Sequence, residues 1–384
     1  MLEIKVDPFT FYWRMTDTPG QPANPVPDFV DFSLTFREDV QLVIQKKNTL
    51  CLEYLECIYK EAYNVGYLQE GHDLAASYGG DVLSFIKSAI SRYTSGSRSL
   101  SEIGAGGCYI LKQMKDAGYQ VSAIDPSPIC HHKAAEFGID VIPTFYPAKQ
   151  SLPKSDIIFH YDVLEHVEDP SDFLSHHVGD LNPGGLVIFA VPDCTSYIER
   201  GDVSMLLHEH LNYYDADSLS NVVRAAGLEV MEITASHHGA VLYCAAKVPA
   251  QATPWVPRSG DAKFSAFQRR FVGLQESVKA FIADAEKTKG SLGCYIPLRT
   301  FPYLGSTSQG MNLRFFDDNA SIYGQYFDGF DCPVENMGDL VAKPVTHLLI
   351  LSSAFGDKIR HKLRTLSPDH SMKIWCLSDY AEPK

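Results

Sequence analysis

The chain has 384 residues, which exceeds one ordinary domain and allows two or three hydrophobic cores. Its net charge of −14 and pI near 5.4 argue against a nucleic-acid partner, because phosphate binding needs basic patches that this chain does not show as runs. No apolar stretch reaches the roughly 20 residues that span a bilayer, and the N-terminus does not read as a signal peptide. We therefore expect a cytoplasmic protein without a membrane or nucleic-acid partner.

The nine cysteines are scattered along the chain and form no C-x-x-C pair. An odd number spread over this length is typical of reduced thiols rather than of a disulfide framework or a four-cysteine zinc site. We expect no metal.

Three regions follow one another along the chain. Residues 1–90 open with a proline-rich, irregular stretch and turn helical around 50–62 and 80–91, so we expect a mainly helical N-terminal region. Residues 91–248 are expected to form a cofactor-binding core. Residues 249–384 begin with a proline-rich linker and a long helical pattern, and then predict a smaller α/β unit that shapes a substrate cleft. The elements expected after the linker are a helix at 262–288, strands at 291–296, 313–317, 347–351 and 372–377, and a helix at 357–366.

The most informative local pattern begins at residue 100, where an apolar run leads into three small residues. Gly104, Ala105 and Gly106 permit a tight turn and a close backbone approach, and a helix can begin after them. A second strand at 120–124 delivers Asp125 to the same edge of the sheet. Its carboxylate can accept both hydroxyls of a ribose, so this pattern predicts a nucleoside pocket.

A dinucleotide and S-adenosylmethionine both contain such a nucleoside, and the residues of this loop favour S-adenosylmethionine. A dinucleotide site needs G-x-G-x-x-G, and the third glycine is missing here. Glu102, two residues before the first glycine, would repel a pyrophosphate but can help to hold an ammonium group. S-adenosylmethionine carries an amino-acid moiety and a sulfonium, so it fits this loop better than a dinucleotide. A glycine turn without a ligand is the simpler alternative, and Asp125 at the right spacing argues against it.

Further strands complete the predicted core. Residues 156–162 form a buried-strand pattern that ends in polar residues, and Asp162 at its end is expected to line the cofactor cleft. Glu165 and His166 follow, and we interpret them as residues that stabilise the start of a helix. Residues 186–192 predict another strand, and 227–236 with 240–246, which the turn at 237–239 separates, predict an antiparallel hairpin.

Four segments in this order and spacing resemble the motifs of class I S-adenosylmethionine-dependent methyltransferases. They read EIGAGGC, IDPSP, DVLEHVEDP and LNPGGLVIFAVP. The resemblance implies a Rossmann-like α/β core, mostly parallel, with a terminal antiparallel hairpin, and S-adenosyl-L-methionine as cofactor.

The tract 207–214, LHEHLNYY, lies between a strand end and the next helix. In a doubly wound sheet such loops line the ligand crevice, so His208, Glu209 and His210 should face the methyl donor. A neutral imidazole with a pKa near ~6.5 can take a proton at cellular pH, and a neighbouring carboxylate can orient it. Two alternatives remain. The H-x-H pair could bind a metal, although no third ligand stands at a suitable spacing, or the histidines could cap and pack the loop.

This tract, the following DADSLSNVVRAAGLEV, the HHG turn and the appended α/β unit resemble the deoxysugar C-methyltransferases that act on nucleotide-linked sugars, over roughly residues 60–384. The resemblance implies that His210 removes the proton next to a keto group, with Glu209 as its polar neighbour. By the same resemblance Tyr67 reaches the acceptor. Loss of that proton develops an enolate oxyanion, so we also expect a hydrogen-bond donor such as His208 or Tyr213 near this oxygen.

The chain departs from this family at several places. Leu207 replaces the tyrosine that begins the family's tract, and Cys108 replaces a glycine. Residues 1–60 lack the ligands of the family's zinc module, and IPLRTFPYLG stands where the family has a glycine-rich turn. These differences bear on the acceptor more than on the cofactor.

We therefore expect an S-adenosylmethionine-dependent methyltransferase that acts on a small molecule, by C-methylation of a keto-sugar or a similar acceptor. An O-methyltransferase of sugars or other small molecules is the alternative, a non-catalytic binding subunit is a second, and an NAD-dependent enzyme is the least favoured. The expected partners are the acceptor, with a nucleotide-linked sugar as the first candidate, and a second copy of the chain in a homodimer.

Overall fold

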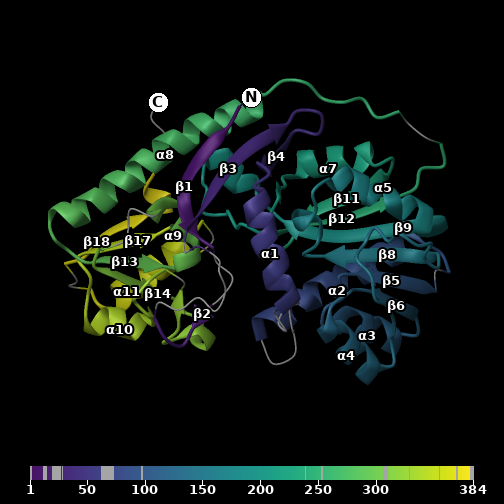
Figure 1. Cartoon of the computed structure of the whole chain (residues 1–384), viewed down its shortest axis with the longest axis horizontal. Coiled ribbons are helices and arrows are strands. Elements are labelled where there is room, and N and C mark those ends of the chain that lie inside the picture. Colours follow the sequence, from purple (N-terminus) through teal and green to yellow (C-terminus); the bar gives the residue numbers. More distant parts are fainter. Residues whose placement is uncertain are drawn as a thin grey trace.

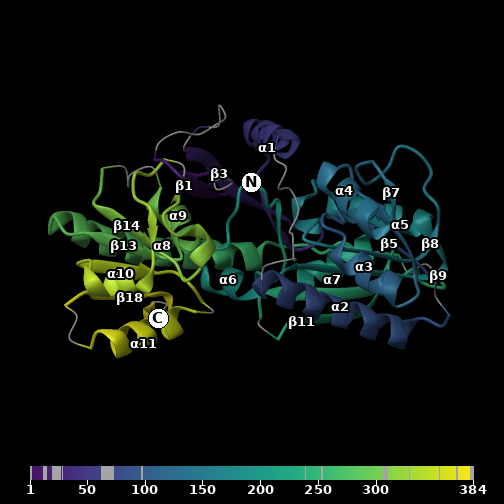
Figure 2. The same ribbon diagram turned by 90° about the horizontal axis from the view of Figure 1, so that it is seen from below.

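The computed structural model describes residues 2–11, 15–19, 27, 29–61, 73–96, 98–237, 239–251, 254–305, 310–327, 329–353, 355–368 and 371–380. Figure 1 shows two lobes, one built on a seven-stranded sheet and one on a five-stranded sheet, with strands β1, β3 and β4 between them. The two lobes stay apart in the view from below (Figure 2). Within the described residues, no helix combines the length and the apolar character needed to cross a membrane.

The seven-stranded sheet has the order β11-β12-β9-β8-β5-β6-β7. All neighbours pair in parallel except β12, which runs antiparallel to both β9 and β11. The strands are β5 (Ser99–Ile103), β6 (Gln120–Ile124), β7 (Asp140–Ile142), β8 (Ser155–Tyr161), β9 (Leu181–Pro192), β11 (Glu229–Ala235) and β12 (Val241–Lys247). This mostly parallel α/β sheet with its terminal hairpin confirms the predicted fold class.

Helices cover both faces of this sheet, which explains why its central strands are continuous apolar runs. One face packs against α2 (Asp73–Tyr93), α3 (Tyr109–Asp116) and α4 (Pro128–Phe137), and the other against α5 (Pro170–Asp180) and α7 (Ala216–Ala225). The helix starts are fixed by side chains: Asp169 caps α5, and Asp215 with Ser218 forms a capping box at α7.

The N-terminal region differs from its prediction. The stretch through Pro27 was expected to be irregular, and no strand was expected before the helices, but this part of the chain contributes β1 (Ile4–Thr10), β3 (Phe29–Arg37) and β4 (Leu42–Gln45) to a separate sheet of order β1-β3-β4-β10. The fourth strand of that sheet, β10 (Asn212–Tyr213), comes from the histidine tract at 207–214. The alternation that would predict β1 is broken by a register shift between Val6 and Phe9, and the partner of β4 lies far along the chain. The two predicted helices are confirmed as α1 (Thr49–Glu61) and α2.

The C-terminal lobe contains a parallel sheet of order β16-β14-β13-β17-β18. The sequence predicted an α/β unit here, with strands where β13, β14, β17 and β18 lie. Its strands are β13 (Leu292–Tyr295), β14 (Leu313–Phe316), β16 (Val334–Glu335), β17 (His347–Ile350) and β18 (Lys373–Cys376). Its helices are α8 (Ala262–Lys287), α9 (Pro297–Leu304), α10 (Met337–Ala342) and α11 (Gly356–Leu366). The sequence did not predict α9, because prolines stand at its start and inside it.

The remaining elements are short. They are β2 (Met15–Thr16), which pairs with β15 (Tyr326–Phe327), the helix α6 (Thr195–Arg200), and the 3₁₀ helices η1 (Leu164–His166), η3 (Ala320–Ile322) and η4 (Leu377–Asp379).

One hydrophobic core joins the N-terminal sheet, the segment 194–213, α8 and the C-terminal lobe. A buried polar contact lies within it. The hydroxyl of Tyr303 donates to a carboxylate oxygen of Asp202 at 2.8 Å and accepts from the backbone N–H of Val203 at 3.0 Å. All three groups are buried, so this contact fixes α9 against the segment that leads to the histidine tract.

Replacing Tyr303 by Phe is expected to lower the free energy of unfolding by about 2–3 kcal/mol, because a buried carboxylate loses a hydrogen bond and a buried N–H is left unpaired. Chemical denaturation with urea measures this difference. The matched control is Tyr323→Phe, since Tyr323 is 37% exposed and its hydroxyl is not enclosed in the core. Equal stabilities of Y303F and the wild type would show that the contact contributes nothing.

Candidate active site

The glycine loop after β5 has the backbone that its sequence predicts. Gly104 has φ +70°, and its N–H donates to the carbonyl of Ile124 at 3.0 Å, which ties the loop to the end of β6. A Cβ at Gly104 would lie 2.8 Å from Cγ2 of Val163. The loop therefore lies directly against the turn that follows β8, and only glycine fits there without strain.

Asp125 follows β6 and holds the same loop through its carboxylate. One oxygen accepts from the N–H of Gly106 at 2.9 Å, and the other accepts from the N–H of Ser127 at 2.7 Å. Each carboxylate oxygen can accept more than one hydrogen bond, so these contacts leave acceptor capacity for a diol. The structure thus places Asp125 beside Gly106, as the spacing predicted.

Glu102 lies under the loop and is fully buried. Neither of its carboxylate oxygens has a well-formed hydrogen bond within the described part of the chain. Burial, with smaller contributions from Cys108 and Asp125, raises the pKa of Glu102 well above its usual range. A buried carboxylate without a partner is costly, and an ammonium group would relieve that cost. This side chain therefore fits a ligand that carries an amino group.

Asp162 directly follows β8 and has the left-handed conformation, with φ +53°. Its charge contributes to raising the pKa of Glu165, so the two carboxyl groups lie near each other. The next residue, Val163, is the one that faces Gly104. The turn that begins with Asp162 therefore contacts the glycine loop through Val163 and continues to Glu165.

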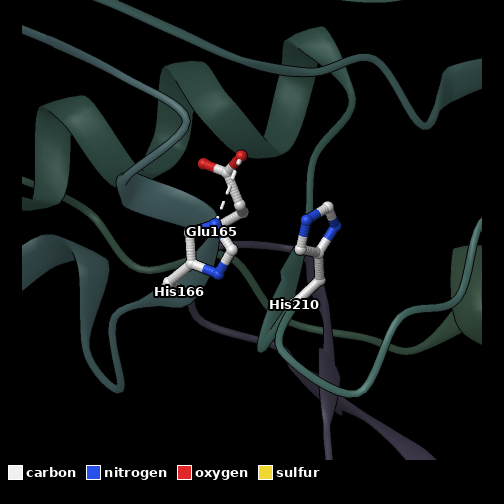
Figure 3. Close-up of side chains that lie close together, drawn as sticks. All are labelled: Glu165, His166 and His210. Carbon is white, nitrogen blue, oxygen red and sulfur yellow. Dashed lines mark ion pairs between the residues drawn. The ribbon is translucent and has the colours of Figure 1, made fainter. Parts of the chain in front are cut away.

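Glu165, His166 and His210 converge, although they belong to two separate loops (Figure 3). One potential ligand atom of each lies within 4.8 Å of those of the other two. Nε2 of His166 is 3.9 Å from Oε1 of Glu165, and the two imidazole rings have their centroids 5.0 Å apart. We call these three side chains the Glu165 cluster. Glu165 and His166 were predicted to stabilise a helix start, and the structure adds them to the candidate site.

Hydrogen bonds hold the histidine tract on the turn that carries Glu165. The N–H of Leu211 donates to the carbonyl of Glu165 at 2.7 Å, the amide of Asn212 donates to the carbonyl of Val167 at 2.7 Å, and the hydroxyl of Tyr214 donates to the carbonyl of Leu164. Nδ1 of His166 lies 2.9 Å from the carbonyl oxygen of Glu209. Since a carbonyl only accepts, Nδ1 carries the proton and Nε2 keeps its lone pair.

Burial changes the ionisation of the cluster. It lowers the pKa of His210 well below its usual value, with smaller contributions from His166 and Arg299. Burial also lowers the pKa of His166, and burial with Asp162 and Glu209 nearby raises that of Glu165. Both imidazoles are therefore neutral near pH 7 and each retains a lone pair.

His208 has a different place from the one expected. Its ring packs against Phe9, Phe11 and Phe32, with centroid distances of 4.2, 4.9 and 5.4 Å. Its Nε2 lies 3.3 Å from the carbonyl oxygen of Val30, and burial lowers the pKa of His208 to about 4. The expectation that His208 faces the acceptor is wrong, because its ring anchors the N-terminal sheet.

Tyr213 and Tyr67 were also expected near the acceptor. The hydroxyl of Tyr213 is buried and donates to the carbonyl of Leu207 at 3.2 Å. It therefore serves the loop's own structure. Tyr67 lies outside the described residues.

Comparison with known proteins agrees with this geometry. A family model described as a methyltransferase domain matches residues 79–233, which contain the glycine loop, Asp125 and the Glu165 cluster. Residues 79–233 are an S-adenosylmethionine-dependent methyltransferase domain. Its predicted cofactor, S-adenosyl-L-methionine, is confirmed.

Two curated relatives and one solved structure illustrate the range of similar proteins. The C-methyltransferase NovU of Streptomyces niveus is 25% identical over 283 residues, which cover 67% of each chain. A ubiquinone biosynthesis O-methyltransferase of Caulobacter vibrioides is 34% identical over 100 residues, which cover 24% of this chain and 40% of that protein. Magnesium protoporphyrin IX methyltransferase (ChlM) of Synechocystis PCC 6803 aligns with a TM-score of 0.39 and 13% identity, over 53% of this chain and 99% of that one.

Replacing Gly104 by Ala is expected to weaken the binding of S-adenosylhomocysteine by at least about tenfold, because the new methyl group collides with Val163, in the turn after β8, and displaces the glycine loop that holds the donor. Isothermal titration calorimetry measures the affinity. Gly118→Ala is the control, since Gly118 also has a positive φ, +91°, but has open space around it. Both variants bear the left-handed strain of about 1–2 kcal/mol, so an equal loss of affinity in both would contradict a specific role for Gly104.

Proposed function

We propose that this methyltransferase acts on a small molecule at an atom that must first lose a proton, most simply a carbon next to the keto group of a sugar. The observation that carries the proposal is the neutral, half-buried His210 in the Glu165 cluster. Val163 connects this cluster to the donor loop, because it precedes Glu165 closely in sequence and faces Gly104. An acceptor beside His210 would thus lie next to the methyl donor.

On the donor side, we assign each loop residue one task. Glu102 compensates the ammonium group, and Asp125 accepts the ribose hydroxyls while it holds the N–H of Gly106. Gly104, Ala105 and Gly106 let the backbone approach the donor, and Asp162 lines the cleft toward the acceptor. Bound S-adenosylmethionine supplies an electrophilic methyl group on its sulfonium.

On the acceptor side, His210 takes the proton from the acceptor atom. Glu209 acts indirectly, because its carbonyl oxygen fixes the ring of His166 against His210. General base catalysis of this kind contributes a factor of about 10²–10⁴, and holding both reactants in a near-attack arrangement is worth roughly 7–11 kcal/mol. Positioning by the two loops therefore supplies most of the acceleration.

The carbon acceptor is supported by the likeness to the C-methyltransferase NovU, which extends over two thirds of the chain. An oxygen acceptor is the second candidate, and the shorter likeness to ubiquinone biosynthesis O-methyltransferases supports it. Proton exchange separates the two, because only a carbon acceptor loses a C–H proton before transfer.

Without the methyl donor, the wild type is expected to exchange the proton next to the keto group of a nucleotide-linked keto-sugar for deuterium, as measured by mass spectrometry. His210→Ala should abolish this exchange and reduce methyl transfer by at least about 100-fold, since it removes the base. It should leave the affinity for S-adenosylhomocysteine unchanged.

His132→Ala is the control for this experiment, because His132 is exposed on α4. Methyl transfer without proton exchange would contradict the carbon acceptor and favour an oxygen acceptor. Full turnover by H210A would remove His210 from the mechanism.

Arg299 supports an acceptor that carries a negative charge, such as the diphosphate of a nucleotide-linked sugar. It comes from α9 of the C-terminal lobe, its Nη1 donates to the carbonyl of Ser204 at 3.1 Å, and its guanidinium lies over the ring of Tyr197. Its charge also reaches His210, where it helps to lower the pKa. The C-terminal lobe thus brings a cation toward the acceptor side of the site.

Arg299→Met is expected to raise the KM of a nucleotide-linked keto-sugar by about tenfold or more, which corresponds to about 1.4 kcal/mol, with kcat changed much less. Steady-state kinetics with the linked sugar and with the free sugar test the charge specifically, because only the linked sugar should be affected. Arg364→Met, at an exposed position on α11, is the control. An equal loss with both substrates would show that Arg299 acts on the fold instead.

A further inference from the structure

Glu165, His166 and His210 together offer one carboxylate and two imidazoles to a common point (Figure 3). We propose that they bind one divalent transition-metal ion, and that this ion holds an oxygen atom of the acceptor. The ion's contact with the acceptor rests on the proposed function, which places the acceptor beside His210. The binding of the ion itself depends only on the three side chains.

The donor set selects the kind of ion. Two imidazoles with one carboxylate are typical of sites for Zn²⁺, Mn²⁺ or Fe²⁺ in which further coordination positions stay open. Mg²⁺ and Ca²⁺ prefer sites made of oxygen atoms, so they fit this cluster less well. The open positions matter here, because they are where a ketone or hydroxyl oxygen would bind.

The distances are compatible with an ion after a small movement. Ligand atoms around a tetrahedral Zn²⁺ lie about 3.4 Å apart, given bonds of about 2.1 Å. The three candidate atoms lie within 4.8 Å of one another, and Nε2 of His166 is 3.9 Å from Oε1 of Glu165. Small side-chain rotations that move the ligand atoms by about 1 Å would bring them to the distances that an ion requires.

Two details prepare the ligands for an ion. His166 donates from Nδ1 to the carbonyl of Glu209, which leaves the lone pair of Nε2 toward the cluster. A metal-binding histidine usually has this outer contact, because it fixes the tautomer and the ring orientation. Oε2 of Glu165 is buried and has no hydrogen-bond partner in the part of the chain that the structure describes. A buried carboxylate oxygen without a partner calls for a cation.

The surrounding charges also favour a cation. Asp162 and Glu209 both act electrostatically on Glu165, which makes three carboxyl groups around the site. Arg299 is the positive charge that reaches His210, and it opposes them. Asp162 and Glu209 therefore act in the sense that favours a cation beside Glu165.

The ion would give the enzyme a second way to activate the acceptor. A ring nitrogen of His210 that binds an ion cannot accept a proton, so its role as base belongs to the ion-free enzyme. With the ion bound, the acceptor oxygen shares a lone pair with the ion. The proton of a hydroxyl acceptor, or the proton on the carbon next to the carbonyl group of a ketone, is lost to water, and the electron pair left on that oxygen or carbon attacks the methyl group. The sulfonium then leaves as a thioether, so charge and atoms balance.

The test measures the ion directly. Purified protein is stripped with a chelator, dialysed against Zn²⁺ or Mn²⁺, and analysed for metal content by mass spectrometry and for affinity by calorimetry. The wild type is expected to bind about one ion per chain, and Glu165→Gln and His166→Ala should each weaken binding by at least tenfold. His132→Ala, on the exposed face of α4, should bind as the wild type does. Thermal unfolding with and without the ion checks that the variants are folded, and only the wild type and H132A should be stabilised by it.

The outcomes separate this inference from the proposed function. Wild-type protein without bound metal, or E165Q and H166A proteins that bind as tightly as the wild type, would overturn the ion site. Undiminished methyl transfer by the chelator-treated enzyme would overturn the ion's part in activation and leave the proposed function intact. A protein that binds one ion through these residues but transfers no methyl group would keep the site and overturn the proposed function.

Discussion

The docking of the histidine tract on the turn after β8 is the contact on which the candidate site depends. The carbonyl groups of Leu164, Glu165 and Val167 receive hydrogen bonds from the tract, and the carbonyl of Glu209 receives one in return from His166. These four carbonyl groups lie outside the sheets and α-helices, so they need hydrogen-bond partners elsewhere. The same bonds that satisfy the backbone therefore bring the side chains of Glu165, His166 and His210 together. Without them, the donor loop would remain but the acceptor side would have no fixed geometry.

The donor side could be predicted from the sequence because its parts are local. The turn at Gly104 and the acid at Asp125 stand at the ends of adjacent parallel strands, and strand ends meet at one edge of a sheet by construction. Spacing along the chain thus translates directly into distance. The predicted hairpin of β11 and β12 follows from the same kind of local information.

The acceptor side could be predicted only in part. His208 and His210 are separated by one residue, yet one ring enters an aromatic cluster of the N-terminal sheet while the other meets His166. Nothing in the tract distinguishes them, since the choice depends on Phe9, Phe11 and Phe32, which lie far away in sequence. For the same reason the spacing of the H-x-H pair could not indicate that Glu165 and His166, from another segment of the chain, lie beside His210. The N-terminal strands escaped prediction because their sheet is completed by the two-residue strand β10, which is too short to show any period.

The pairing of β10 with β4 has a consequence for the order in which the protein can fold. The paired strands of the seven-stranded sheet lie closer together along the chain than β4 and β10 do, so their contacts close smaller loops at lower entropic cost. Asn212 and Tyr213, in contrast, pair with Ile44 and Val43, across most of the methyltransferase domain. That contact can form only when both ends of a long loop are already in place. The acceptor side is therefore expected to be completed after the donor side, so that a folding chain acquires the ability to hold S-adenosylmethionine before it acquires the means to use it.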